Sequence, residues 1–296
     1  MSKLKEKSLA LDTVALTDTG MVRANNEDNL LALDTTEIAV AGLSSCGIYL
    51  VADGMGGHQG GEVASDMAVK IIPDFLKERL KSAEKLLDPD KLIGQAIQKA
   101  NQAIYDAALD TPDLFTMGTT VTLGFRLDNR LFIGHVGDSR AYLVRKNRIR
   151  QLTEDHSLVA RLLQERVITP EEAKNHPDRN KIYRCLGVSP RIGIDSYRQV
   201  SGKDCLVLNS GDTLVFCTDG LSGYVSDEEI LNCLLKADGA ESACQELIRL
   251  ANLKGGEDNI SIIVVRAITV AGERRLPAVK PDRQITKKRP QELSTH

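Results

Sequence analysis

Tryptophan is absent from this chain of 296 residues, and all aromatic residues together make up only 4% of it. The hydrophobic core must therefore be built mainly from leucine, isoleucine, valine and alanine. No stretch approaches the roughly 20 consecutive apolar residues that a membrane-spanning helix needs. The first residues, MSKLKEKSLALDT, lack the apolar segment and the small-residue cleavage site of a signal peptide. We therefore expect a cytoplasmic protein without a membrane span.

The six cysteines show neither a C-x-x-C pair nor a tight cluster. This spacing argues against a zinc site and against a disulfide framework, so reduced thiols are expected. The formal net charge of -3 is also small. It provides no field of one sign that would draw the whole molecule to nucleic acid or to an anionic membrane. What remains is an ordinary globular chain, in which 42% of the residues are apolar and 27% are charged.

The chain divides into three parts by composition. Residues 1–10 form a polar lead-in, residues 11–268 carry continuous structural pattern, and residues 269–296 are rich in proline and charge. The last part predicts a flexible basic tail, because it has too few apolar residues to form a packed core. The middle part contains six short apolar runs typical of strands: 47–53, 120–127, 130–136, 140–144, 212–219 and 259–265.

The arrangement of these runs indicates the fold class. Apolar residues at every second position of the run 120–127 predict a strand with one buried face. Asp128 and Asn129 follow it and predict a tight hairpin, in which Asn129 can take a positive φ. Helical patterns lie between the groups of strands, and one of them opens with the capping-box pair Ser226 and Glu229. Hairpin-like strands with paired helices between them favour antiparallel sheets covered by helices.

Four acidic residues stand at the ends of predicted strands. Asp53, Asp138 and Asp219 follow apolar runs, and Asp258 immediately precedes the last run. If these carboxylates meet at one edge of a sheet, a cation must offset their repulsion. Oxygen-only ligand sets suit hard cations such as Mg²⁺ or Mn²⁺. Each aspartate could instead cap a turn or a helix start, but four acidic strand ends favour a metal site.

Seven segments, taken together and in this order, resemble the bacterial type 2C protein phosphatases, the metal-dependent PPM family. They are residues 17–29, 51–65, 117–120, 134–142, 152–157, 218–229 and 255–265. The resemblance spans residues 11–268. It implies an α+β fold, a four-layer αββα sandwich in which two antiparallel sheets pack face to face and helix pairs flank them. It also implies a two-metal centre at one end of the sandwich.

The resemblance assigns the ligands of that centre residue by residue. Asp53 matches the carboxylate that bridges both metals, and the Gly54 carbonyl matches a ligand of one of them. Asp219 and Asp258 match ligands of the other metal. Two divalent cations, Mn²⁺ or Mg²⁺, are therefore expected in each active site.

Further residues match the family in its catalytic positions. Asp28 resembles the acid that holds metal-bound water, Asp138 resembles a ligand of a third metal found in bacterial members, and Arg23 resembles the phosphate-binding arginine. Met55 stands where animal relatives carry a histidine proposed as general acid. The proton donor is therefore open between His58 and water on a third metal held by Asp138.

The expected activity is hydrolysis of phosphoserine and phosphothreonine on proteins by a water that bridges two divalent cations. The enzyme would oppose a Ser/Thr kinase, act on phosphorylated proteins that include the kinase or its substrates, and work as a monomer. Residues 157–191 correspond to the variable flap beside the active site. Two alternatives are a pseudophosphatase that serves as a binding module and a phosphatase of small phosphoesters. The intact Asp53, Asp219 and Asp258 argue against the first.

Two further patterns suggest other chemistry and are set aside. Cys185 and Arg191 spell C-x5-R, the pattern of cysteine phosphatases, but that mechanism needs a loop whose backbone N–H groups point at the phosphate. Pro190 removes one such donor, and the segment lies in the expected flap. His156 follows the run of residues 152–155 and is expected to be a helix-start residue rather than a catalyst.

Overall fold

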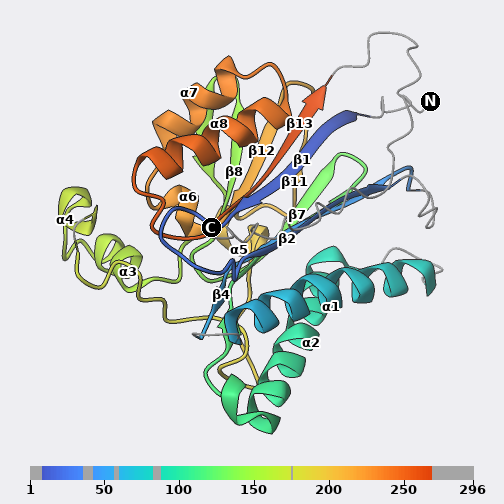
Figure 1. Cartoon of the computed structure of the whole chain (residues 1–296). Coiled ribbons are helices and arrows are strands. Elements are labelled where there is room, and N and C mark those ends of the chain that lie inside the picture. Colours follow the sequence, from blue (N-terminus) through green and yellow to red (C-terminus); the bar gives the residue numbers. More distant parts are fainter. Residues whose placement is uncertain (1–8, 36–42, 57–59, 83–87, 175, 269–296) are drawn as a thin grey trace, which may run out of the picture.

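The computed structural model describes residues 9–35, 43–56, 60–82, 88–174 and 176–268. Two antiparallel sheets pack face to face, and a pair of long helices covers the outer face of each (Figure 1). This is the four-layer α+β sandwich expected from the sequence. Residues 1–8 of the expected lead-in and the whole of the expected tail lie outside the described residues.

The first sheet contains both ends of the described chain. Its strands follow one another in the order β1 (Ala10–Asp18), β13 (Ile260–Ile268), β12 (Thr213–Cys217), β8 (Arg140–Arg145) and β9 (Arg148–Gln151). All neighbours in this sheet are antiparallel. β1 and β13 pair over nine residues, and this long ladder fixes the first strand of the fold to the last.

The second sheet is also antiparallel. Its order is β10 (Asp195–Ser196), β7 (Arg130–Val136), β6 (Val121–Leu127), β3 (Cys46–Ala52) and β2 (Asn29–Thr35), and β11 (Leu206–Val207) pairs with β7. A small third sheet joins β4 (Gly54–Met55) to β5 (Gly118–Thr119). β4 begins two residues after the end of β3, so this small sheet lies at the end of the sandwich.

The layer between the two sheets is filled from both sides. Tyr49 on β3 stacks on Phe216 of β12, with ring centroids 5.8 Å apart. Because strand side chains alternate, Ile48 and Leu50 face the opposite way and join the core beneath the helices of the second sheet. Burial of apolar side chains on both faces contributes roughly 1.5–3 kcal/mol for each large residue.

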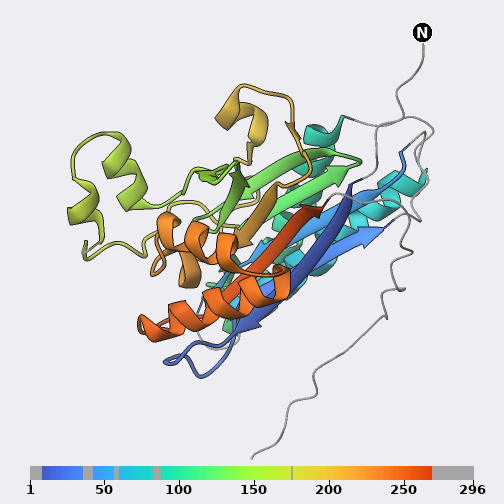
Figure 2. The same cartoon turned by 90° about the horizontal axis from the view of Figure 1, so that it is seen from above.

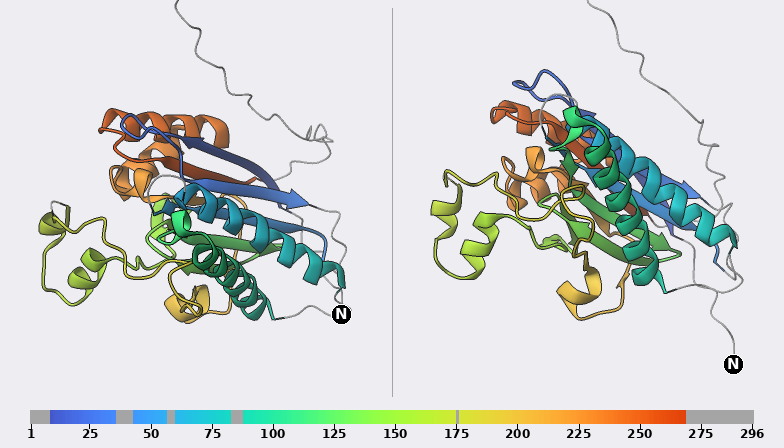
Figure 3. Two further views of the ribbon diagram at one scale, coloured as in Figure 1. Left: turned by 60° about the horizontal axis from the view of Figure 1, so that its bottom comes forward. Right: turned by 90° about the horizontal axis from the view of Figure 1, so that it is seen from below.

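Two helix pairs form the outer layers (Figures 2 and 3). α1 (Gly60–Ser82) and α2 (Pro89–Asp110) cover the second sheet, and α7 (Asp227–Lys236) and α8 (Ala240–Leu253) cover the first. The Ser226 hydroxyl accepts from the Glu229 N–H and the Glu229 side chain accepts from the Ser226 N–H, which confirms the predicted capping box. The shorter helices are η1 (Pro112–Leu114), α5 (Tyr197–Ser201) and α6 (Asp219–Ser222).

β6 differs from the sequence prediction because both of its faces are buried. The residues that were expected to face solvent lie against other parts of the fold. A Cβ atom at Gly124 would run into the ring of Phe216, and Arg126 is buried by its contacts with Asp34 and Tyr49. A strand in the middle of a sandwich contacts helices on one side and a sheet on the other, so strict alternation of apolar and polar residues is not required.

The hairpin between β6 and β7 is present, but Asp128 takes the positive φ of 54° instead of Asn129. Two backbone N–H groups, those of Ser44 and Ser45, donate to the Asp128 side chain, and Arg126 donates to its carbonyl oxygen. The contacts from Ser44 and Ser45 come from a distant part of the sequence, so the local pattern does not show which turn residue takes the positive φ.

Between β9 and β10 the chain leaves the sandwich and forms α3 (Leu158–Gln164) and α4 (Pro170–Lys174). Figure 1 shows these two helices projecting to one side of the body. Both helices lie within residues 157–191, the segment for which the sequence analysis expects a flap. Among the described residues, no helix is both long enough and apolar enough to cross a membrane.

Candidate metal centre

Five aspartates lie at one end of the sandwich, and the strands place them there. Asp53 follows β3, and Asp28 precedes β2, whose first residue is paired with the last residue of β3. In the other sheet, antiparallel pairing brings the end of β12 beside the start of β13. The structure therefore gathers the four acids that the sequence analysis singled out at strand ends, Asp53, Asp138, Asp219 and Asp258, and it adds Asp28, which only the family resemblance had pointed to.

The pKa values of these acids show that they lie close enough for their charges to affect one another. Burial raises the pKa of Asp53 well above its usual range, and the charges of Asp219, Asp28 and Asp138 raise it further. Burial likewise raises the pKa of Asp219, and the charge of Asp258 adds to the effect. Carboxylates in this situation must hold protons or be neutralised by a cation.

Asp28 and Asp138 follow the same pattern. Burial is the largest cause of the raised pKa of Asp28, and hydrogen bonds from Ser261 and Thr218 oppose it. Burial also raises the pKa of Asp138, and the charge of Asp219 adds to it. Asp28 is buried, and the other four acids are partly buried, so each member of the cluster is shielded from water to some degree and lies near like charges.

The chemistry of the donor set fits a divalent cation. Oδ1 of Asp219 is buried without a hydrogen-bond partner among the described residues, although a buried carboxylate oxygen normally accepts at least one hydrogen bond. In the described part of the chain, no three His, Cys, Asp or Glu side chains stand in a ready-made coordination arrangement. Arg23 turns the carboxylate of Asp258 toward itself, and Thr218 holds that of Asp28. An all-oxygen set of this kind suits Mg²⁺ or Mn²⁺.

Gly54 continues the chain directly from Asp53 and lies in a position where only glycine fits. A Cβ atom there would run into the backbone carbonyl oxygens of Gly61 and Glu27. Gly54 is buried in β4, against the start of α1. The glycine-rich loop thus lets the backbone next to Asp53 approach its neighbours closely.

Two threonines fix the backbone of Asp53. The Thr119 hydroxyl donates to the Asp53 carbonyl oxygen at 2.9 Å, and the Thr120 hydroxyl accepts from the Asp53 N–H at 3.0 Å. Thr120 also shares a hydrogen bond of 2.8 Å with Ser139, the residue after Asp138. The sequence analysis included residues 117–120 among the matching segments but assigned them no role, because the contact spans more than sixty residues.

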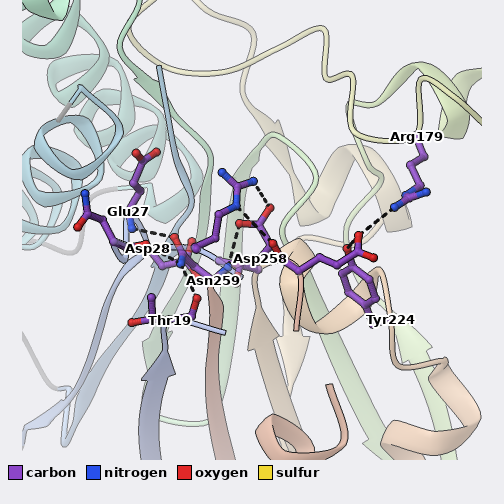
Figure 4. A network of polar contacts seen from close by, with 11 residues as sticks. Thr19, Glu27, Asp28, Arg179, Tyr224, Asp258 and Asn259 are labelled. Atoms are coloured by element: carbon purple, nitrogen blue, oxygen red, sulfur yellow. Dashed lines mark hydrogen bonds and ion pairs between the residues drawn. The ribbon is translucent and has the colours of Figure 1, made fainter. Parts of the chain in front are cut away.

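Asn259 joins the loop that carries Asp28 to the loop that carries Asp258 (Figure 4). Its Oδ1 atom accepts from the Glu27 N–H at 2.8 Å, and its Nδ2 group donates to the carbonyl oxygens of Thr19 and Asn25, each at 2.9 Å. A single side chain thus satisfies three backbone groups of the loop. The sequence analysis did not single out Asn259, although it lies in a matching segment beside Asp258.

Arg23 lies on the same loop and is half exposed. Its Nη2 group donates to Oδ2 of Asp258 at 2.9 Å, and its Nε group donates to the Glu257 carbonyl oxygen at 3.4 Å. Because an exposed ion pair of this kind contributes about 1 kcal/mol or less, the guanidinium can exchange this partner for another anion at little cost.

His156 is not the helix-start residue that the sequence suggested, because Ser157 is the N-cap of α3. His156 is buried. Its Nδ1 atom accepts from the Gly137 N–H at 2.9 Å, and its Nε2 atom lies 3.1 Å from Asp195. Burial lowers the pKa of His156, which favours the neutral ring that accepts at Nδ1 and donates from Nε2. His58, one of the two candidate proton donors, lies outside the described residues.

Cys185 is buried, and burial raises the pKa of its thiol to about 11. A thiol with such a pKa is almost entirely protonated at neutral pH and is therefore a poor nucleophile. The geometry agrees with the sequence argument against a cysteine mechanism.

Known proteins resemble both this sequence and this structure. Residues 13–260 match the family model described as protein phosphatase 2C. The serine/threonine phosphatase stp of Listeria welshimeri is 38% identical over 251 residues, which cover 84% of this chain and 93% of that protein. The crystal structure of the Mycobacterium tuberculosis serine/threonine phosphatase PstP/Ppp superposes with a TM-score of 0.74 at 35% identity, covering 88% of this chain and 99% of that chain.

A further solved structure is described as the catalytic domain of the serine/threonine protein phosphatase PstP in complex with two manganese ions. It superposes with a TM-score of 0.71 at 35% identity and covers 88% of this chain and 100% of that one. This chain therefore belongs to the protein phosphatase 2C family. It is a metal-dependent serine/threonine protein phosphatase, as the sequence predicted.

Proposed function

We propose that Asp53, Asp219, Asp258 and the Gly54 carbonyl hold two divalent cations, with Asp53 bridging them. The observation that carries this assignment is the cluster of carboxylates at one end of the sandwich, in which Oδ1 of Asp219 is buried and has no hydrogen-bond partner among the described residues. Two cations at this position would acidify a shared water and neutralise the charge on the phosphoryl group. Mn²⁺ or Mg²⁺ fits the all-oxygen donor set equally well.

Arg23 would bind the phosphate of the substrate, and Asp28 would orient the attacking water. Arg23 offers a planar fork to the phosphate oxygens, and it can leave Asp258 for them because its present ion pair is exposed and weak. Asp28 is held by a hydrogen bond of 2.8 Å from the Thr218 hydroxyl. That contact fixes the Oδ2 atom of Asp28, so the carboxylate is held in place to orient an attacking water.

Asp138 is the residue for a third cation in this proposal. It lies in the turn between β7 and β8, and the charges of Asp219 and Asp155 act on it. Water on a third cation held by Asp138 would donate the proton to the leaving serine alkoxide. His58 remains the alternative donor, since it is the nearest histidine in sequence to Asp53.

The physiological setting follows from the activity. We infer that the phosphorylated proteins include a Ser/Thr kinase or its substrates, that the chain acts as a monomer, and that residues 157–191 form a flap of the catalytic domain 11–268. The Leu158 N–H donates to the Lys181 carbonyl oxygen within the flap, and the Tyr183 N–H donates to the carbonyl oxygen of His156, the residue just before the flap. Substrates that approach Asp138 must pass beside this excursion.

The test is hydrolysis of matched phosphoserine and phosphotyrosine peptides by the purified full chain, with Mn²⁺, with Mg²⁺ and after chelation. Mn²⁺- or Mg²⁺-dependent release of phosphate from the phosphoserine peptide is the expected result. Undiminished release after complete removal of metal would refute the metal assignment. Equal rates on phosphotyrosine would contradict the serine/threonine specificity.

A further inference from the structure

A cleft of about 700 Å³ separates the flap from the body of the molecule. At its inner end it is lined by Asp138, Asp219 and Asp258, the acids of the proposed metal centre. From there it runs between the flap helices on one side and the segment that joins α6 to α7 on the other. The cleft is thus continuous with the site where phosphate is released.

The flap side of the cleft is mainly apolar. α3 contributes Val159, Ala160 and Leu163, which share one face because residues four apart lie one above the other on a helix. α4 contributes Pro170 and Ala173, three residues apart on its own face. The two short helices therefore present a common apolar wall.

The charges that line the cleft beyond the metal centre are largely paired with one another. Arg140 holds Asp155 through hydrogen bonds of 2.6–3.0 Å, and Lys254 holds Glu229 at 2.6 Å. Arg179 reaches out of the flap to Glu257 at 3.3 Å (Figure 4). Because these groups neutralise one another, the outer part of the cleft offers little net charge to a ligand.

The substrate of this enzyme is a phosphorylated residue within a polypeptide, so the neighbouring residues must leave the metal centre along its surface. An extended chain advances about 3.3–3.6 Å per residue, which brings a side chain one to three positions from the phosphoserine into this cleft. An apolar wall with paired charges around it favours an apolar side chain and disfavours a charged one.

We propose that this cleft is a specificity subsite that binds one apolar side chain, such as leucine, within three positions of the phosphorylated residue. The inference rests on the proposed function and deepens it by naming the substrate class. Transfer of a leucine side chain out of water is worth roughly 1.5–3 kcal/mol, equivalent to about 10–150-fold in kcat/KM.

The experiment measures kcat/KM for phosphoserine peptides with leucine or aspartate at each position from three before to three after the phosphoserine. Leucine should be preferred at least about tenfold at one of these positions. The ratio of the two peptides is the readout, since a general change at the metal centre cancels in it. No position with such a preference in the unaltered protein would overturn the proposal.

Variants locate the preference in the structure. Ala160→Phe should fill the cleft and bring the ratio to within about twofold of one. Gln164→Phe is the matched control, because Gln164 lies on the same helix, is exposed and does not line the cleft, and it should keep the ratio. Leu163→Lys, at a partly exposed position, gives the same test if Ala160→Phe does not fold, and it should reverse the preference toward the aspartate peptide.

The two hypotheses fail in different ways. A leucine preference that persists in folded Ala160→Phe and Leu163→Lys proteins would place the subsite elsewhere and leave the metal-dependent activity standing. Absence of metal-dependent hydrolysis of every peptide by the unaltered protein would instead refute the proposed function.

Discussion

His156 and Gly137 are joined by two reciprocal hydrogen bonds. The Gly137 N–H donates to Nδ1 of His156 at 2.9 Å, and the His156 N–H donates to the Gly137 carbonyl oxygen at 2.8 Å. Gly137 precedes Asp138, and the His156 carbonyl oxygen accepts from Tyr183 at the far end of the flap. One buried histidine therefore contacts both the residue that precedes a proposed metal ligand and Tyr183 of the proposed flap.

We predict that His156→Ala lowers the free energy of unfolding by about 1–3 kcal/mol, because the buried Gly137 N–H loses its acceptor. His156→Asn should recover part of this loss, since its amide oxygen can reach the same N–H. The measurement is urea unfolding of the three proteins, together with the Mn²⁺ concentration that gives half-maximal activity. A shift in that concentration in the alanine variant alone would show that His156 positions Asp138. Equal unfolding and equal Mn²⁺ dependence in all three proteins would remove both roles.

Arg23→Ala should raise KM for a phosphoserine peptide about 10–100-fold, because a charge-assisted contact to the phosphate is lost in the ground state as well as the transition state. The KM of Arg23→Lys should lie between those of the unaltered protein and Arg23→Ala, since an ammonium keeps the charge but not the bidentate geometry. Steady-state kinetics on one peptide measures both effects. A large loss of kcat with KM unchanged would point to a role confined to the transition state.

Metal-free protein should become less stable as the pH rises. Burial and neighbouring charges raise the pKa of Asp53 in the folded state, so the folded protein binds more protons than the unfolded chain. The stability contributed by these protons is present in acid and is lost as the pH rises through the raised pKa values. Thermal unfolding in the presence of a chelator should therefore show a melting temperature that falls as the pH rises above the ordinary range of a carboxyl pKa.

Asp53→Asn is the control for that effect. It removes one of the repelling charges, so its metal-free form should melt above the metal-free unaltered protein at pH 8, by about 2–4 °C for each kcal/mol of repulsion relieved. A lower melting temperature for the variant would show that the cluster is not repulsive in the folded protein.

Asp138→Ala should impair hydrolysis of a phosphoserine peptide far more than hydrolysis of p-nitrophenyl phosphate. A serine alkoxide must be protonated as it leaves, whereas p-nitrophenolate departs readily as an anion, and general acid catalysis contributes about 10²–10⁴-fold. Kinetics on both substrates gives the comparison. Equal losses would leave Asp138 as a general metal or structural ligand, and a selective peptide defect in His58→Ala alone would move the role to His58.

Part of this site can be found in the sequence because its residues lie beside regular elements. Asp53 and Asp219 directly follow apolar strands, and the pattern of those strands shows that they end there. The contacts that hold the acids in place cannot be found in this way. Thr218 reaches Asp28 across 190 residues, and Asn259 reaches Glu27 across 232 residues. Only the strand pairing brings such residues together.

The fold shows the same division. The alternation of strand groups and helix pairs favours antiparallel sheets covered by helices, and the family resemblance adds that two such sheets pack face to face. The burial of both faces of β6 and the choice of Asp128 for the positive φ depend on residues from other strands and loops. Local pattern therefore predicts the layers, and tertiary contacts decide the details within them.

The central claim is that Asp53 bridges two divalent cations in the cluster of carboxylates at one end of the sandwich. Isothermal titration of the metal-free full chain with Mn²⁺, combined with elemental analysis after dialysis, measures how many ions bind. The account predicts at least two ions for the unaltered protein, and loss of tight binding together with loss of phosphoserine hydrolysis in folded Asp53→Asn. Two tightly bound ions and an undiminished rate in that variant would contradict the account.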